Sequence, residues 1–208
     1  MEGEKMLLLT LITGSFLAYS ASYYYHQQQA VLTNLPGTNQ FFTSTPFLSD
    51  LQWCFLSGHL AIRSYYTSAK SPLIWLLFLL LLWYLNLLVL YDYYEQAYPT
   101  VLLVIPAITG LILPSSQYLL SNLLFLSILI ILAVQGKMGS GDVYFFILLA
   151  LNFPGQTALR AFLFGSLLAI AHIIPINHFQ RPKQNQEAHR HYPLLPYLYW
   201  GLNLQFWL

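Results

Sequence analysis

Two aspartates are the residues of this sequence best suited to chemistry. Asp92 follows the apolar run 72–91, and Asp142 precedes the apolar run 143–153. When two carboxyl groups lie close together, both cannot ionise cheaply, and one of them holds a proton. The ionised group can then accept a proton from water while the protonated group donates one to a carbonyl oxygen. Such a pair could hydrolyse a peptide bond without a metal or a covalent intermediate.

Four residues near the aspartates could contribute to such a site. Gly139 and Gly141, in the stretch KMGSGD, would let the backbone approach a substrate closely and begin the next helix with little bulk. Lys137 could attract a carboxylate of the substrate, although it also suits a plain anchor on the cytosolic side. Glu95 comes three residues after Asp92 and would share its face if the helix continues. It could tune Asp92 or simply be solvated at the membrane interface.

Each aspartate also has a purely structural interpretation. Asp142 could only cap the helix that follows it, because an aspartate is favourable at a helix N-terminus. Asp92 could only anchor a helix end at the interface. Asp50, the third aspartate of the chain, lies in a less certain span and is the weaker partner for Asp142. The sequence leaves open whether any two of these carboxyl groups meet.

The composition indicates an integral membrane protein. Of the 208 residues, 57% are apolar and only 7% are charged, whereas about 25% of a typical soluble domain is charged. A net charge of +1 gives no basic surface for nucleic acid. The single cysteine, Cys54, excludes an intramolecular disulfide and a cysteine metal cluster, and we expect it to be a buried apolar residue. The three histidines of 178–191, His178, His189 and His191, match no known ligand spacing and are expected in a solvated loop, so we expect no zinc or other metal site.

The apolar runs predict an all-α, polytopic transmembrane bundle that forms one membrane-embedded domain over residues 1–208. A spanning helix needs about 20 mainly apolar residues, and fewer inside a bundle. The runs that suit a span are 6–24, 72–91, 98–114, 117–134, 143–153, 157–176 and 192–208. The run 47–67 is weaker because it contains several polar and charged residues, so we expect seven or eight spans. We interpret the first run as a retained helix and not as a cleaved secretory signal.

Two polar segments set the predicted orientation. Residues 25–46 are polar and should form a loop, whereas 178–191 contains three of the eight basic residues. Because basic loops face the cytosol, 178–191 should be cytoplasmic. Counting spans back from it places both Asp92 and Asp142 on the cytosolic side, whether or not 47–67 spans. If 47–67 does span, 25–46 is a cytoplasmic loop as well.

Four stretches of the sequence carry a resemblance to a known family. They are GSFLAYSASYY at 14–24, YDYYEQAYP at 91–99, GKMGSGD at 136–142 and HYPLLPYLYWG at 191–201. In this order they are similar to the opening helix, the two catalytic motifs and the closing helix of the type IV prepilin peptidases, which are GxGD membrane aspartyl proteases. The chain looks most like the Firmicute branch that processes competence pseudopilins or type IV pilins. A GxGD motif alone would be a weak signal, and the four stretches in order are more specific.

The resemblance implies an activity and a location. It implies an aspartic-type endopeptidase of the bacterial inner membrane, with Asp92 and Asp142 as its catalytic pair. The substrate would be a prepilin or pseudopilin, cut after a glycine at the cytosolic face of the bilayer. Proteolysis would need no cofactor. Many family members also methylate the new N-terminus with S-adenosylmethionine, but no residue of this chain can be assigned to that cofactor.

One departure from the family concerns residues 25–70. Longer members carry there a cytoplasmic insert with two CxxC pairs that suit zinc, and this chain has no such pairs. Either a degenerate insert occupies 46–72, or the insert is deleted and 47–67 is the second helix, which we favour. Three other functions stay open: a GxGD protease of another kind, such as a preflagellin or signal-peptide peptidase; a decayed peptidase; and a non-enzymatic scaffold or small transporter that uses the aspartates for protons or ions.

Overall fold

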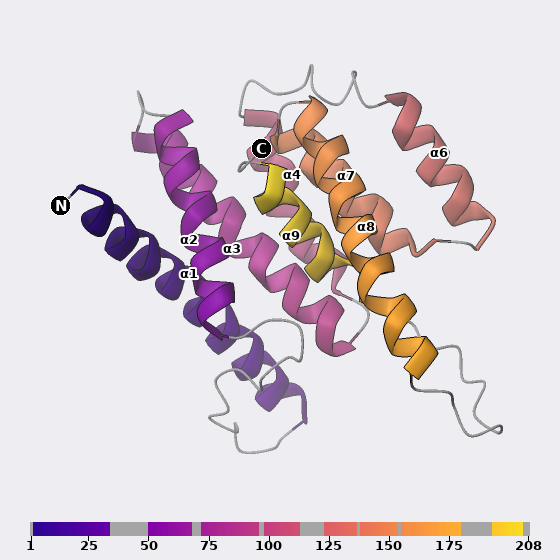
Figure 1. Ribbon diagram of the computed structural model, residues 1–208, viewed down its shortest axis with the longest axis horizontal. Helices are drawn as coiled ribbons and strands as arrows, with labels where there is room; N and C mark the ends of the chain where they lie inside the picture. Colours follow the sequence, from indigo (N-terminus) through magenta and orange to yellow (C-terminus); the bar gives the residue numbers. More distant parts are fainter. Residues whose placement is uncertain are drawn as a thin grey trace.

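The described part of the chain consists of helices and contains no β-strand (Figure 1). The computed structural model describes residues 2–33, 50–67, 72–95, 98–112, 123–136, 138–153, 155–179 and 193–205. The elements are α1 (Glu2–Thr33), α2 (Asp50–Thr67), α3 (Pro72–Glu95), the 3-10 helix η1 (Thr100–Leu103), α4 (Val104–Ile112), α6 (Leu123–Val134), α7 (Ser140–Asn152), α8 (Gly155–Phe179) and α9 (Leu195–Gln205). For these residues the all-α prediction is confirmed.

Helix α3 illustrates how the sequence sets an element. Pro72 is its first residue, a position at which the missing N–H costs nothing. Residues 73–91 contain no glycine or proline, so nothing interrupts the helix before its last turn. Among the described residues, α3 and the segment Gln156–Ile174 of α8 are long and apolar enough to cross a membrane. The shorter apolar helices are Thr100–Ile112, Leu123–Val134 and Ser140–Asn152.

The core lies around the second half of α3, α7 and α9. These segments bury apolar residues on all sides, among them Leu85, Phe145 and Leu198, which are fully inaccessible. One hydrophobic cluster joins them to α1, α2, α6 and α8. Helix α6 stands at the outer edge of the bundle in Figure 1 and packs on α7. The bundle therefore has an inner group of helices covered by outer ones.

Helix α2 packs directly against α1 through glycines. A Cβ atom on Gly14 would lie 1.7 Å from the carbonyl oxygen of Cys54, and one on Gly58 would lie 1.8 Å from that of Thr10. Only glycine allows two backbones to approach so closely, a form of contact common between membrane helices. The uncertain run 47–67 thus contains a helix, beginning at Asp50, that belongs to the bundle.

Buried polar contacts tie α9 to the helices around it. The hydroxyl of Tyr199 donates to Ser57 Oγ over 3.0 Å, and Ser57 donates to Asn86 Oδ1 over 2.9 Å. These residues come from α9, α2 and α3, and all three are buried. On its other side, α9 places Gly201 against α8, where an added Cβ would lie 2.1 Å from the Ala161 carbonyl oxygen. Since buried polar groups must be paired, this network sets the register of the three helices.

The predicted loop 25–46 was wrong at its beginning. Residues 25–33 continue α1, because the segment contains glutamine and alanine, which support a helix, and no glycine or proline. After residue 24, the first glycine or proline in the sequence is Pro36. Residues 34–46 lie outside the described part of the chain.

Two other predicted boundaries also change. His178 and Phe179, at the start of the predicted basic loop 178–191, still belong to α8, and the rest of that loop lies outside the described residues. Helix α7 begins three residues before the predicted run 143–153, at Ser140. Its start falls in the glycine-containing stretch because the apolar run defines the buried part of a helix and not its first turn.

Replacing Gly58 by alanine should destabilise the bundle, because the new methyl group would overlap the Thr10 carbonyl oxygen. We expect a loss of about 1–3 kcal/mol, as for other overpacked sites, measured as thermal unfolding in detergent micelles. Ser15→Ala, at a partly exposed position of the same helix as Thr10, is the matched control and should change little. Equal melting temperatures for Gly58→Ala and the unchanged protein would contradict the close contact.

Candidate functional site

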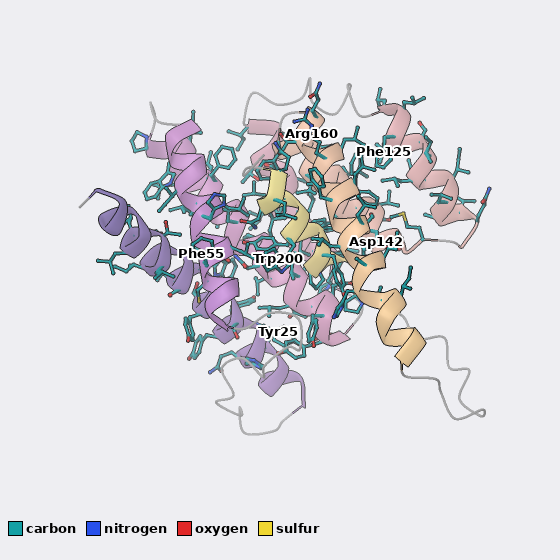
Figure 2. The ribbon with its side chains drawn as sticks, in the orientation of Figure 1. Tyr25, Phe55, Phe125, Asp142, Arg160 and Trp200 are labelled. Atoms are coloured by element: carbon teal, nitrogen blue, oxygen red, sulfur yellow. The ribbon has the colours of Figure 1, made fainter. Side chains whose placement is uncertain are left out.

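Both candidate aspartates lie at helix ends. Asp92 is in the last turn of α3. Asp142 is in the first turn of α7 and is labelled in Figure 2. Both side chains are partly exposed, and both lie outside the apolar runs 72–91 and 143–153. They are near enough that the negative charge of Asp92 raises the pKa of Asp142. The structure therefore brings the two carboxyl groups to the same end of the bundle.

The carboxylate of Asp92 binds to the beginning of α9. The N–H of Leu195 donates to Asp92 Oδ2 over 3.0 Å, and the N–H of Leu194 is a second donor. The carbonyl oxygen of Leu194 accepts hydrogen bonds from Tyr197 and Leu198, which marks it as the residue from which α9 begins. The first N–H groups of a helix lack partners within the helix and form its positive end. Helix α9 therefore supplies donors to a residue about one hundred positions earlier in the chain.

Asp142 makes a local contact at the start of its own helix. Gly139 is the N-cap of α7 and has no side chain that could cap it. The Asp142 carboxylate accepts a hydrogen bond from the Gly139 N–H, and the Asp142 N–H donates to the Gly139 carbonyl oxygen over 3.2 Å. This is the carboxylate half of a capping box. The capping interpretation of Asp142 thus describes one of its contacts and is compatible with a pair.

Tyr98, which the sequence analysis did not select, lies near both aspartates. It lies between α3 and η1, and its hydroxyl donates to the carbonyl oxygen of Gly141 in the first turn of α7. Burial raises the pKa of Tyr98, and the charges of Asp142 and Asp92 raise it further. The phenol therefore faces both carboxyl groups. The sequence signal that could have identified Tyr98 was its place directly before Pro99, because the Tyr98-Pro99 dipeptide follows Asp92 closely in the chain.

The two predicted site glycines lie against protein groups. A Cβ on Gly141 would be 3.1 Å from the hydroxyl oxygen of Tyr98, and one on Gly139 would be 3.3 Å from Asp142 Oδ2. Both distances are shorter than ordinary contacts of a Cβ atom. Glycine at these positions therefore makes room for the tyrosine and for the carboxylate themselves.

Opposing effects set the protonation of the pair. Burial raises the pKa of Asp92 to about 6, while the hydrogen bonds from Leu195 and Leu194 act in the opposite direction. Burial also raises the pKa of Asp142 to about 7, the charge of Asp92 adds to the rise, and the hydrogen bond from Gly139 opposes it. Both groups therefore titrate near neutral pH, as a hydrolytic pair of carboxyl groups requires.

Glu95 and Lys137, the other two predicted site residues, are not placed beside the two aspartates by any described contact. Glu95 is exposed at the end of α3, and its carboxylate accepts a hydrogen bond from the hydroxyl of Tyr25 on α1. The ring of Tyr25 also stacks on Tyr94, with the centroids 5.4 Å apart, at the end of α1 seen low in Figure 2. Glu95 thus faces the α1 side of the helix end. Lys137 lies outside the described residues.

The cysteine and the metal-ligating residues do not form a second site in the described ranges. Cys54 is buried at the contact of α2 with α1. In the part of the chain that the structure describes, no group of three or more histidine, cysteine, aspartate or glutamate side chains could hold a metal ion. The chemistry that the described residues offer is therefore that of the two carboxyl groups and the nearby phenol.

Comparison of the chain with models of protein families, with curated proteins and with solved structures gave no match.

Replacing Asp142 by asparagine should stabilise the protein at alkaline pH. The pKa of Asp142 is raised from 3.8 to about 7 in the folded state, so the protonated form contributes stability that is complete below the unfolded value and lost as the pH rises through about 7. Asparagine cannot ionise and avoids this loss. Between pH 5 and pH 8, the melting temperature of the variant should gain on the order of 5 °C over the unchanged protein.

Thermal unfolding in detergent micelles at both pH values would measure this gain. Glu95→Gln removes an exposed carboxylate and is the control for a change of charge alone. A difference between Asp142→Asn and the unchanged protein that stays constant from pH 5 to pH 8 would contradict the burial of this carboxyl group.

Proposed function

We propose that this protein is a membrane-embedded aspartic endopeptidase that removes the leader of prepilin-like proteins. The observation that carries the proposal is the position of two carboxyl groups from separate helix ends, where burial and, to a smaller extent, the charge of Asp92 raise the pKa of Asp142 to about 7. Such a pair holds one proton near neutral pH and has the two functions that peptide hydrolysis needs. The resemblance of the motifs to type IV prepilin peptidases gives the substrate class.

The same proposal includes a bundle of seven or eight spans in the bacterial inner membrane. It is supported by the apolar helices of the structure and by the large apolar side chains on its outer surface, such as Phe16, Leu111, Leu124 and Leu167. The packing of α2 inside the bundle favours eight spans. The basic residues Arg181, Lys183 and Arg190, which follow α8 in the sequence, favour a cytosolic position for the ends of the helices that carry the aspartates.

Hydrolysis follows from one proton shared by the pair. The ionised carboxylate takes a proton from water as the water oxygen attacks the scissile carbonyl carbon. The protonated carboxyl group gives its proton to the carbonyl oxygen, and a neutral gem-diol results. When the carbon–nitrogen bond breaks, the newly protonated carboxyl group donates to the leaving nitrogen, and a hydroxyl of the diol returns a proton to the other carboxylate. The pair is then restored, and no metal takes part.

The substrate would place a glycine and the start of its hydrophobic helix beside the pair. A prepilin carries a short basic leader on the cytosolic side, so the scissile bond would lie at the membrane boundary where Asp92 and Asp142 are proposed to lie. Methylation of the new N-terminus with S-adenosylmethionine would be an additional activity of the same kind of enzyme. The described residues provide no specific support for it.

Asp92→Asn and Asp142→Asn should each lower the rate of cleavage of a co-expressed prepilin by at least about 10³-fold. The reason is that either change removes one of the two proton-transfer groups. The measurement is the gel shift between precursor and mature prepilin, with membrane insertion checked by fractionation. The control is Asp50→Asn, at the remaining aspartate of the chain, which should keep activity. Cleavage by Asp142→Asn would refute the proposed catalytic pair of Asp92 and Asp142. Loss of cleavage in Asp50→Asn would indicate that Asp50 belongs to the catalytic pair.

Tyr98→Phe should slow cleavage by about tenfold, the kinetic equivalent of one hydrogen bond. The change removes only the hydroxyl that binds the Gly141 carbonyl oxygen and so loosens the first turn of α7, which carries Asp142. We expect kcat to fall with little change in KM, and the pH profile to shift because the phenol faces both carboxyl groups. Tyr93→Phe removes a phenol hydroxyl from the residue next to Asp92 in the chain; it is the control and should leave kcat unchanged. An unaltered kcat and pH profile in Tyr98→Phe would exclude a positioning role.

A further inference from the structure

The two aspartates differ in the backbone N–H groups that donate to them, and the beginning of α9 donates to Asp92. Asp92 Oδ2 accepts a hydrogen bond from the N–H of Leu195 over 3.0 Å, and the Asp92 carboxylate accepts a second one from the N–H of Leu194. Asp142 accepts one backbone N–H, that of Gly139. Hydrogen bonds from N–H donors stabilise the ionised form of a carboxyl group, because that form only accepts. Two donors on one carboxylate and one donor on the other favour different protonation states.

We infer that the N-terminus of α9 makes Asp92 the ionised, water-activating member of the pair and leaves the proton on Asp142. Asp142 then protonates the carbonyl oxygen of the substrate. This assignment rests on the proposed peptidase function for its catalytic meaning, and it gives Leu194 and Leu195 a positioning role through their backbone N–H groups.

The partial charges at helix ends also change the cost of ionising each aspartate, and some of these effects oppose the assignment. Asp92 lies at the negative end of α3, which disfavours its charge, and at the positive end of α9, which favours it. Asp142 lies at the positive end of α7. The hydrogen bond of an N–H group to a charge is stronger than the effect of a helix end on an exposed group. The additional donor on Asp92 therefore decides the order.

Other titratable groups around the pair do not reverse this order. Tyr98 faces both carboxyl groups and remains a neutral phenol because its pKa is raised. Glu95, on the same helix as Asp92, accepts a hydrogen bond from the hydroxyl of Tyr25 on the α1 side. Between α8 and α9, Nδ1 of His172 and the hydroxyl of Tyr197 are hydrogen-bonded to each other over 2.6 Å.

The chain allows a direct titration of this site, because it contains only three aspartates. Full-length protein labelled with ¹³C at the aspartate carboxyl carbon should give three resonances, which the Asn variants of Asp50, Asp92 and Asp142 would assign. In detergent micelles from pH 4 to pH 9, we expect the Asp92 resonance to report ionisation at lower pH than that of Asp142. The reverse order would overturn the assignment.

Removal of a single N–H group tests the cause of that order. An ester in place of the backbone amide of residue 195, introduced as the α-hydroxy acid of leucine by cell-free translation, keeps the side chain and removes the donor to Asp92. The midpoint of Asp92 should rise by about one pH unit, a tenfold change in proton affinity. The same ester at Leu198, whose N–H binds the Leu194 carbonyl oxygen within α9, is the matched control and should leave the midpoint in place. Equal midpoints in the two ester variants would overturn the role of α9.

Activity gives a separate readout. The acid limb of the pH profile of cleavage should move upward in the residue 195 ester and stay in place in the residue 198 ester. If the protein cleaves no prepilin, the proposed function fails, while the titration still decides which carboxyl group the beginning of α9 stabilises. If the residue 195 ester does not fold, the order of titration in the unchanged protein decides alone.

Discussion

The cost of burying two neighbouring carboxyl groups is the constraint on which the rest of the site depends. Burial alone raises the pKa of Asp92 and Asp142, and a second negative charge beside the first is more costly still. The protein offsets this cost with backbone N–H groups, from Leu195 for one carboxylate and from Gly139 for the other. These donors come from the beginnings of two different helices. Three helix ends must therefore meet at one place.

The interior of the bundle explains how they meet. Helices α3 and α9 touch at two levels: Asp92 with the Leu195 N–H, and Asn86 with Tyr199 through Ser57. On each helix the two levels are one turn or more apart, about 6–9 Å along the axes. A single contact would allow α9 to slide or rotate along α3, whereas two contacts fix both the position and the rotation. The buried polar network in the core thus holds the N–H groups of α9 in line with a carboxylate at the edge.

The sequence predicts the helices and the aspartates of this site better than it predicts their surroundings. Asp92 and Asp142 could be selected because charges are rare in this chain and stand out beside apolar runs. The end of α1 was misjudged because polar glutamines resemble a loop in composition although they support a helix. Tyr98 resembled one of many interfacial tyrosines. The donors on α9 are backbone atoms, which every residue except proline has, so no residue type reveals them before the fold places Leu195 beside Asp92.

The position of the site at helix ends follows from the same requirement for N–H donors. Within a helix, almost every N–H group already binds a carbonyl oxygen four residues earlier, and only the first turn has free donors. If the chain spans a membrane as we propose, those first turns lie at the boundary between lipid and water, because unpaired backbone groups are costly inside lipid. The boundary is also where water, the second substrate of hydrolysis, is available. The donors that stabilise one carboxylate and the water that it would activate are therefore found at the same depth, and the beginnings of α7 and α9 reach that depth beside the end of α3.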